Sequence, residues 1–478
     1  MKQIVMRAGK SPFDVVTPDE LIHRDLMGTN AGNLLFSDAV HRQLTLPDTE
    51  VVAAGIRTDP SPENAARINE RFDAYAVPLA NAFRPSFAKS LDRLSALIEQ
   101  LKIPVVVIGV GAQTGTEYDT DRLDELSGPV KRFMKAVLDR SASVGVRGEL
   151  TADYLKGLGF RDVEVIGCPS MFWHGESFPQ LEQKPLDANS RVAVNISAQA
   201  SREGGIAELA ALALRLHPKL SYYAQNLSDA ELLFWGDTSR SADRHKELPA
   251  LRSHPLLTGG HTRVPIDPSI WMRELATHDF SFGTRIHGNM AALLAGTPSV
   301  VLAHDSRTLE LCRYFEIPHR LLRDVEADTA PQTLLEEADY GPLRSNHAER
   351  FRRYVDFLDR NGLRNTFSHG DSGAAWDAEL ATLDLPPSLT AWDGHDDGAL
   401  GYRVAWLREQ VGQARRGQDK ATARVREVEA ENKELRKLTG SLEKRLASLE
   451  KRLDDSSGPL RRVGRGVKRR TKAAFGEG

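Results

Sequence analysis

The sequence predicts an α/β protein with two similar halves, followed by a C-terminal coiled-coil helix and a basic tail. Two observations lead to this prediction. Short apolar runs alternate with helix-like stretches in both halves, and the hydrophobic period changes to seven residues from about Val404. Alternating strands and helices build parallel sheets that helices cover on both faces, and 478 residues exceed the roughly 250–300 that one core supports.

The first half, residues 1–178, contains apolar runs that are typical of buried parallel strands. Expected strands are KQIVM, PVVVIGVG, SVGVR and VEVIG, and expected helices are SFAKSLDRLSALIEQLK, PVKRFMKAVLDR and GELTADYLKGLG. A polar, proline-containing stretch at 179–190 then interrupts the alternation. It is expected to be a linker between two domains.

The pattern resumes in the second half, residues 191–364. Expected strands are RVAVNIS, KLSYYAQN, DFSFG and TPSVVLAH, and expected helices are GIAELAALALRLH, GNMAALLAG and RTLELCRYFEI. A helix that ends at Gly362 carries an apolar stripe, and we assign it to this half as a packing helix. Residues 365–401 are predicted to form a flexible connector.

A heptad repeat over residues 402–455 predicts a coiled coil, which is strongest over 425–453. The flanking charges, such as Arg424 and Glu429, have opposite signs in the pairing that parallel helices in register would make. Asn432 is a single polar residue at the seam, and such residues fix register. We expect a parallel homodimer through 425–453, and one long solvated helix without a partner is the alternative interpretation.

Residues 456–478 are predicted to form a basic disordered tail. The stretch RRVGRGVKRRTKAAF carries only basic charges, which is typical of a solvated tail and also suits an anionic membrane surface. The whole chain has 63 Lys and Arg against 66 Asp and Glu, and this balance argues against a nucleic-acid partner.

The cysteines and the apolar runs indicate a cytoplasmic protein, with peripheral contact at the inner face of the membrane as an option for the tail. Cys168 and Cys312 lie far apart and show no metal-ligand spacing, so neither a disulfide framework nor a zinc site is indicated. The start of the chain lacks the apolar stretch of a signal peptide, and the longest apolar run is half of a membrane span.

The stretch DFSFGTRIHGNMAALLAGTP contains the strongest candidate for a functional site. A strand is expected to pass into a helix between Gly283 and Gly288, and the first amides of that helix favour an anion. Arg285 adds donors that suit phosphate or carboxylate, and His287 adds a titratable group. The alternative interpretation is a packed or capping histidine.

Three further loops follow expected strands or precede expected helices. SVGVRGELTADYL places Arg147 where it could bind an anion or pair with a carboxylate such as that of Glu149. MGTNAGNLL carries Asn30 and Asn33, and GVGAQTG carries Gln113 and is a weak relative of phosphate loops. Ligands of open α/β sheets bind beyond the carboxyl ends of the strands, so a site is expected at these loops.

These stretches recur in the order of a known family. Over roughly residues 25–322, GTNAGN, IGVGAQ, VGVRGELTADYLKGLGFRDVEVIGCPSMF and TRIHGNMAALLAGTPSVVLAHDSRTLELCRYF resemble the polysaccharide pyruvyl transferase family. The resemblance implies two Rossmann-like domains in a GT-B-type arrangement, phosphoenolpyruvate as the donor substrate and a glycan acceptor. It implies no cofactor and no metal.

By position, His287 resembles the general acid of the family. The residues that the resemblance and the loops assign to substrate binding are Arg285, Arg147, Gly288, Asn30, Asn33, Gln113, Asp305 and Arg307. Two features depart from the family pattern. Arg307 stands where the family often has a lysine, and the long stretch AGKSPFDVVTPDELIHRDLM separates the first strand from GTNAGN and leaves the acceptor undefined.

The expected function is transfer of the pyruvyl group of phosphoenolpyruvate onto two hydroxyls of a sugar in a cell-surface polysaccharide or its precursor. The reaction would form a cyclic ketal and release phosphate, as a step of exopolysaccharide biosynthesis for the cell envelope. His287 would protonate the donor, because a bound dianion favours imidazolium. The acceptor would be a glycan, or a lipid-linked or nucleotide-linked sugar. Two alternatives stay open: a GT-B glycosyltransferase that uses a nucleotide sugar, and a catalytically inactive scaffold for glycan assembly.

Overall fold

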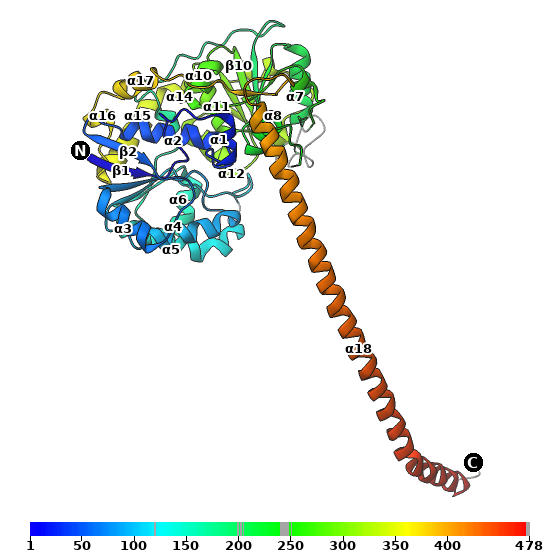
Figure 1. Cartoon of the computed structure of the whole chain (residues 1–478). Helices are drawn as coiled ribbons and strands as arrows, with labels where there is room; N and C mark the ends of the chain where they lie inside the picture. Colours follow the sequence, from blue (N-terminus) through cyan, green and yellow to red (C-terminus); the bar gives the residue numbers. More distant parts are fainter. Residues whose placement is uncertain are drawn as a thin grey trace. The chain divides into compact units, whose positions relative to one another are not determined.

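The computed structural model describes residues 1–118, 121–197, 200, 203, 205–239, 248–249 and 251–474. The chain forms two compact units, Met1–His395 and Asp396–Gly478. The predicted α/β class with parallel sheets is confirmed in the first unit, where two separate sheets are surrounded by helices (Figure 1).

The first sheet has the strand order β2-β1-β3-β4, and all of its pairs are parallel. These strands are β1 (Lys2–Met6), β2 (Thr49–Ala53), β3 (Ala74–Pro78) and β4 (Val105–Ile108). A parallel pair, β5 (Val144–Val146) with β6 (Val163–Val165), continues the sheet through a bridge between Val110 and Val146. Four of these six strands follow the predicted runs, and β2 and β3 were not predicted.

Helices cover both faces of the first sheet, as the apolar runs predict. The helices of this half are α1 (Pro18–His23), α2 (Gly32–Leu44), α3 (Pro62–Arg71), α4 (Ala88–Ile98), α5 (Ser127–Leu138) and α6 (Glu149–Gly157). Short 3-10 turns lie at Pro85–Phe87, Asp121–Leu126 and Pro169–Phe172. Alternate strand residues face opposite helices, since Ile4 and Met6 belong to one buried cluster and Val5 to another.

The second sheet has the order β12-β11-β10-β7-β8-β9-β13, parallel except for β13 at one edge. Its strands are β7 (Val192–Asn195), β8 (Ser221–Tyr223), β9 (Thr262–Val264), β10 (Phe280–Gly283), β11 (Ser299–Ala303), β12 (His319–Leu321) and β13 (Leu389–Thr390). The four strands predicted in this half are present as β7, β8, β10 and β11. The short strands β9, β12 and β13 were not predicted.

The helices of the second half connect these strands. They are α7 (Ile206–Leu216), α8 (Leu227–Phe234), α9 (Pro255–Thr258), α10 (Pro268–Leu275), α11 (Ile286–Leu294), α12 (Ser306–Phe315), α13 (Pro331–Glu336) and α14 (Gly341–Ser345), with a 3-10 turn at Leu322–Asp324.

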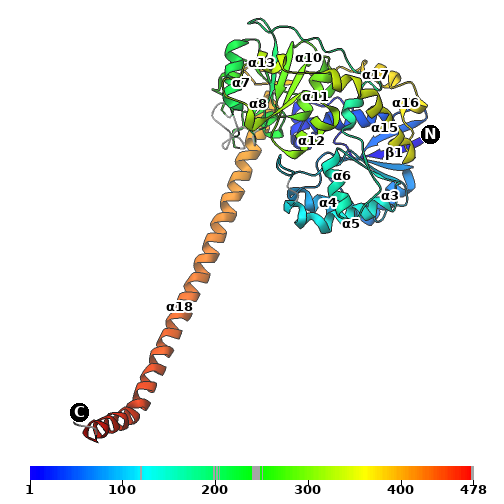
Figure 2. The same cartoon turned by 180° about the vertical axis from the view of Figure 1, so that it is seen from behind.

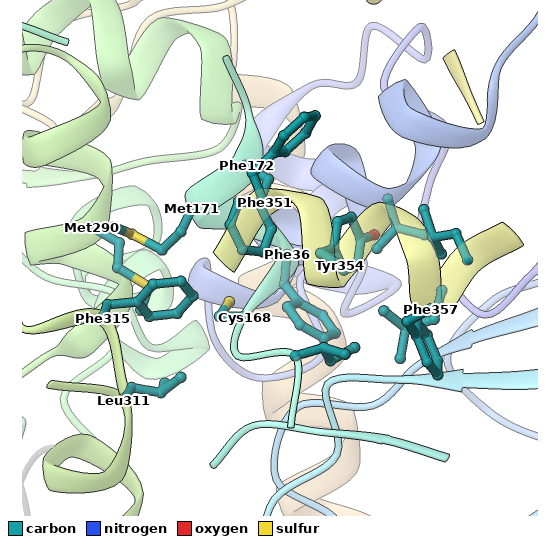
Figure 3. Close-up of a cluster of buried hydrophobic side chains, with 14 of the residues drawn as sticks. Phe36, Cys168, Met171, Phe172, Met290, Leu311, Phe315, Phe351, Tyr354 and Phe357 are labelled. Carbon is teal, nitrogen blue, oxygen red and sulfur yellow. The ribbon is translucent and has the colours of Figure 1, made fainter. Parts of the chain in front are cut away.

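Helix α15 (His347–Arg360) contacts both halves, whereas the sequence assigned it to the second half alone. Phe357 lies against Gly145 of β5, and Arg350 donates a hydrogen bond to the carbonyl of Phe315. Tyr354 and Phe357 lie in a buried cluster with Phe36 and Phe172 of the first half (Figure 3). The side chain of Asn361, at the end of α15, donates a hydrogen bond to the Ser143 hydroxyl at 3.0 Å. The apolar stripe predicts that the helix packs, but not that the chain crosses back to the other sheet.

Residues 365–401 are not the flexible connector that the polar composition predicted. This stretch contains α16 (Thr366–His369), α17 (Ala374–Leu380) and β13. The Trp376 indole is buried and donates a hydrogen bond to Nδ1 of His41 at 3.1 Å, and Asp377 pairs with Arg42 at 2.6 Å. A buried aromatic and an ion pair to α2 therefore hold most of the stretch on the first unit.

The second unit contains one helix, α18 (Leu400–Ala474), which Figure 2 shows as a long helix that bends near its C-terminal end. The side chains at the predicted seam are exposed, for example Leu435 at 60% and Leu442 at 59%. The helix includes residues 456–474, for which the sequence predicted disorder, and residues 475–478 lie outside the described part. Within the described residues, no helix combines the length and apolar character needed to cross a membrane.

Candidate active site

A cavity of about 900 Å³ lies at the carboxyl ends of the strands of both sheets. Its wall includes the loops that follow β1, β2, β3, β4 and β5 in the first half and β8, β10 and β11 in the second. This is where ligands of open α/β sheets bind. Among the described residues, seven arginines line the cavity against three carboxylates. The arginines are Arg7, Arg57, Arg84, Arg93, Arg147, Arg285 and Arg307, and the acids are Asp25, Glu203 and Asp305. The surplus of positive charge suits an anionic ligand.

His287 lies in the first turn of α11 and lines the cavity. Its Nε2 is 3.7 Å from the Cys168 sulfur, and its ring lies edge-on to Phe36 with centroids 6.3 Å apart. Gly32 of the GTNAGN loop makes room for the ring, because a Cβ at Gly32 would lie 2.6 Å from Nδ1. The loop and the histidine were predicted as separate features, and the structure brings them into contact.

The surroundings of His287 disfavour its charged form. Burial is the largest cause, and the charges of Arg147, Arg307 and Arg285 add to it, so that the pKa falls from 6.5 to about 3. The imidazole is therefore neutral at pH 7 in the protein by itself. A role as proton donor requires an added negative charge beside the ring.

Arg285 is the N-cap residue of α11, and its guanidinium is oriented by the second half. Its Nη2 donates to Oδ1 of Asn226 at 2.6 Å, and its backbone N–H donates to Oδ1 of Asn195 at 2.9 Å. Nε is buried without a hydrogen-bond partner among the described residues. Burial lowers the pKa of this guanidinium. A buried guanidinium donor of this kind can bind an anion in the cavity.

Gly288 does not line the cavity, although the sequence placed it in substrate binding. A Cβ at this position would lie 2.5 Å from the Gln225 side-chain nitrogen and 2.9 Å from Cγ of Asn195. The glycine therefore allows α11 to approach the ends of β7 and β8 closely. Its role is packing, one layer behind the site.

Arg147 is 1% exposed, yet it borders the cavity. Its Nη2 donates to the carbonyl of Ala80, while Nε and Nη1 have no hydrogen-bond partner among the described residues. Burial lowers its pKa to about 10, and the nearby Glu310 opposes this shift. A Cβ at Gly111 would lie 2.6 Å from Nε, so this glycine of the GVGAQTG loop makes room for the guanidinium. The alternative pairing with Glu149 is not seen.

Asp305, Arg307 and Gln113 form one network at the start of α12. Asp305 caps the helix by accepting from the Thr308 N–H and hydroxyl, both at 2.8 Å, and it pairs with Nη2 of Arg307 at 3.0 Å. Gln113 donates to the same carboxylate at 3.3 Å. Burial alone would raise the pKa of Asp305, but Arg307, His304 and the Thr308 hydrogen bonds lower it to about 2. Asp305 therefore stays ionised and orients Arg307.

Asn30 and Asn33 line the cavity and also shape their own loop. Oδ1 of Asn30 accepts from the Gly32 N–H at 2.8 Å, and Nδ2 of Asn33 donates to the carbonyls of Met27 and Gly28 at 3.1 and 2.9 Å. Gly28 adopts a φ of 58°, which favours glycine. These asparagines set the position of Gly32, and through it that of His287.

Four of the arginines that line the cavity, and Asn226, were not predicted from the sequence. Arg7 follows β1 directly, Arg57 and Arg84 follow β2 and β3 by a few residues, and Arg93 lies on α4. The available signal was a basic residue just beyond the carboxyl end of a strand. This signal could have identified Arg7, which follows a predicted strand. It could not have identified Arg57 and Arg84, because the strands before them, β2 and β3, were not predicted.

Comparison with known proteins gives one family. The family model of the polysaccharide pyruvyl transferases matches residues 30–306, which is more than half of the chain. This range contains Asn30, Arg147, Arg285, His287 and Asp305. No curated protein sequence matches the chain significantly.

Solved structures resemble the chain at low identity. UDP-GlcNAc 2-epimerase from Neisseria meningitidis bound to UDP-GlcNAc is 12% identical, with 80% of this chain and 100% of that chain covered and a TM-score of 0.37. The Methanocaldococcus jannaschii UDP-GlcNAc 2-epimerase, in complex with UDP-GlcNAc and UDP, is 11% identical, with 80% and 100% covered and a TM-score of 0.37. The glycosyltransferase SnogD from Streptomyces nogalater is 14% identical, with 75% and 96% covered and a TM-score of 0.30.

Proposed function

The chain belongs to the polysaccharide pyruvyl transferase family, and from this premise we propose that it transfers the pyruvyl group of phosphoenolpyruvate onto two hydroxyls of one sugar. The product is a cyclic ketal, and inorganic phosphate is released. The observation that carries the proposal is His287 at the wall of a cavity, where the charges of Arg147, Arg285 and Arg307 act on it. No metal or cofactor takes part in the proposed reaction.

The three arginines match the charge of the donor. Phosphoenolpyruvate carries a carboxylate and a phosphate, about three negative charges near neutral pH. Arg147, Arg285 and Arg307 each have a buried Nε without a partner among the described residues, so each can donate further hydrogen bonds. The first amides of α11 add donors at the positive end of the helix dipole.

In the proposed reaction, binding of phosphoenolpyruvate favours the protonated form of His287. By itself the protein keeps His287 neutral, because the ring is buried and the arginines repel its proton. A trianionic donor cancels the repulsion of three guanidinium groups and raises the pKa of the ring. His287 then becomes a proton donor only when the substrate to be protonated is present.

The proposed reaction has two steps, and each step forms one C–O bond. His287 donates its proton to the methylene carbon of the donor, while one sugar hydroxyl forms a C–O bond to the neighbouring carbon and loses its own proton to the ring. A second hydroxyl of the same sugar then forms a second C–O bond to that carbon. The bond between that carbon and the phosphate oxygen breaks, and the proton of the second hydroxyl leaves with the phosphate. The methylene has become a methyl group, and the histidine has returned to its charged form.

We place this reaction in exopolysaccharide biosynthesis for the cell envelope, on the cytoplasmic side. The acceptor is a glycan precursor, carried on a nucleotide or a lipid. The basic residues after Gly458 would keep the enzyme close to an anionic membrane surface, at about 1 kcal/mol for each basic residue near the lipid.

A second copy of the chain is the proposed partner of α18. The exposed leucines of the heptad repeat need a partner, and a 75-residue helix that is polar around its other faces is not stable through local propensity alone. Arg424 with Glu429, and Arg445 with Glu450, would pair between parallel helices in register. The proposed assembly is therefore a parallel homodimer.

The test is turnover of phosphoenolpyruvate by full-length His287→Ala protein. Wild-type protein, mixed with phosphoenolpyruvate and extracts of nucleotide-linked and lipid-linked sugars, is expected to release phosphate and to add pyruvic acid minus water to one sugar, detected by mass spectrometry. The His287→Ala protein should keep its thermal unfolding temperature and lose this activity. His319→Ala, on the exposed edge strand β12, is the matched control and should remain active. Turnover by His287→Ala near the wild-type rate would remove His287 from the reaction, and protection of the wild type by a nucleotide sugar but not by phosphoenolpyruvate would indicate a glycosyltransferase.

A further inference from the structure

The cavity holds more positive charge than the donor needs. Ligand pockets of about 300–1,000 Å³ hold drug-sized molecules, whereas phosphoenolpyruvate has only about ten non-hydrogen atoms. With a cavity of about 900 Å³, most of the space is left for a second ligand. Three of the seven arginines act on His287, and four others, Arg7, Arg57, Arg84 and Arg93, line the part of the wall that the first half provides.

Arg7 and Arg84 come from different loops and converge on one aromatic ring. The guanidinium carbons of Arg7 and Arg84 lie 5.9 and 5.7 Å from the centroid of the Phe87 ring. Both guanidinium groups contact the same ring, and the ring neutralises neither of them, because a cation–π contact leaves the guanidinium N–H groups free for other acceptors. This pair, at the ends of β1 and β3, is fixed by the first sheet.

No carboxylate in the described part of the chain lies within ion-pair distance of Arg7, Arg57 or Arg84, in contrast to Arg307 with its partner Asp305. Nε of Arg84 is buried without a hydrogen-bond partner there. Burial lowers the pKa of both Arg7 and Arg84. The lower pKa means that keeping these charges partly out of water costs free energy. An anion in the cavity would offset that cost.

The two sets of arginines are neighbours but distinct. The charges that act on His287 come from Arg147, Arg285 and Arg307, whereas the charge of Arg84 is coupled to Arg307. Arg307 therefore lies near both His287 and Arg84. A sugar that bridges the two sets would present hydroxyls toward His287 and its anionic substituent toward Arg84.

We propose that Arg7 and Arg84, with Arg57 and Arg93 at the rim, form a second anion subsite that binds the diphosphate of a diphosphate-linked sugar, the acceptor of the reaction. The proposal rests on the proposed function for the role of this ligand. A neutral glycan would leave both guanidinium groups on Phe87 without a counter-charge, and a single carboxylate would neutralise only one of them. A diphosphate carries at least two negative charges on adjacent groups and can accept from both.

The test is calorimetric titration of full-length protein with two probes, UDP and geranyl diphosphate, in the presence of saturating phosphoenolpyruvate. At least one probe is expected to bind while the donor is bound. Arg84→Gln and Arg7→Gln are each expected to weaken that binding at least tenfold. Arg71→Gln is the matched control: this arginine also lies over a phenylalanine ring, 5.2 Å from the centroid of Phe72, but it is outside the cavity, and its loss should change binding less than twofold.

The outcomes separate the subsite from the donor reaction. Binding of UDP alone identifies a nucleotide carrier, and binding of geranyl diphosphate alone identifies a lipid carrier, and both support the subsite. The subsite would be overturned if neither probe binds. It would also be overturned if the probe competes with phosphoenolpyruvate and if probe binding is lost in Arg285→Gln but kept in folded Arg84→Gln and Arg7→Gln. If phosphoenolpyruvate does not bind but a diphosphate binds through Arg84, the subsite stands and the proposed function fails.

Discussion

Arg147 is the residue at which binding and stability conflict most directly. It is 1% exposed, and two of its nitrogens have no partner among the described residues. Its pKa falls from 12.5 to about 10, mainly through burial. At about 1.4 kcal/mol per pKa unit, keeping this guanidinium charged in the folded protein costs about 3 kcal/mol. The buried charge of Arg147, which we propose for donor binding, therefore reduces the stability of the ligand-free fold.

Replacing Arg147 by Met removes the charge and keeps an unbranched side chain of similar length. Glu310 loses the opposing charge, but burial already raises its pKa to about 7, and Thr151 still donates to both of its oxygens. The free energy of unfolding without ligand is expected to rise by about 1–3 kcal/mol, as when other buried charges are replaced by apolar groups. The stabilisation by phosphoenolpyruvate, about 2.7 kcal/mol at a hundredfold excess over Kd, should disappear.

The assay is urea denaturation of full-length protein with and without phosphoenolpyruvate, with Arg140→Met as the control. Arg140 donates three hydrogen bonds, to the carbonyls of Leu101, Ala136 and Glu99 at 2.7–2.9 Å. Its loss should lower the free energy of unfolding by about 2–4 kcal/mol, at roughly 1 kcal/mol for each bond, and leave the response to the donor unchanged. If Arg147→Met is destabilised as much as Arg140→Met and still responds to phosphoenolpyruvate, the reasoning is refuted.

Three further predictions concern other parts of the chain. Gly111→Ala should displace the Arg147 guanidinium and weaken donor binding at least tenfold in calorimetry, because the added Cβ would lie 2.6 Å from Nε; unchanged binding would show that the guanidinium is dispensable. Burial raises the pKa of Asp38 from 3.8 to about 8, so between pH 4 and pH 8 the folded protein keeps this carboxyl protonated while the unfolded chain ionises it. The free energy of unfolding therefore falls as the pH rises through this range. Asp38→Asn should flatten the fall in urea midpoint between pH 5 and pH 8, and an unchanged slope would contradict the assignment. The proposed dimer predicts that full-length protein is dimeric in light scattering and that replacing Leu435 and Leu442 together by Lys gives a monomer; a dimer that persists would place the interface elsewhere.

The strands that could be predicted from the sequence are those whose signal is local. The run PVVVIGVG becomes β4, and DFSFG becomes β10, because continuous apolar residues bounded by turns describe a strand buried on both faces. Strands β9 (TRV) and β12 (HRL) contain one apolar residue each, so neither an apolar run nor an alternation marks them in the sequence. Helix α15 was found, but its partner was not, since an apolar stripe does not say which of two sheets it covers.

For the site, motif residues were predictable and their supports were not. His287, Arg285 and Arg147 were singled out from the sequence, and all three line the cavity. Gly288 was predicted to bind substrate but does not line the cavity, because a glycine at a helix start serves packing and binding equally well. Arg84 could not be predicted, since its role depends on contacts between β-strand ends that are far apart in the sequence.

The charge of the His287 imidazole, with and without phosphoenolpyruvate, is the central test of the proposed reaction. Full-length protein labelled with ¹⁵N-histidine, compared with His287→Gln to assign the signal, reports the protonation of the ring by NMR. Without ligand at pH 7, His287 is expected to be neutral, in keeping with a pKa of about 3, and saturating phosphoenolpyruvate is expected to give the imidazolium signal. A ring that is already charged without ligand, or one that stays neutral when the donor is bound, would contradict the account.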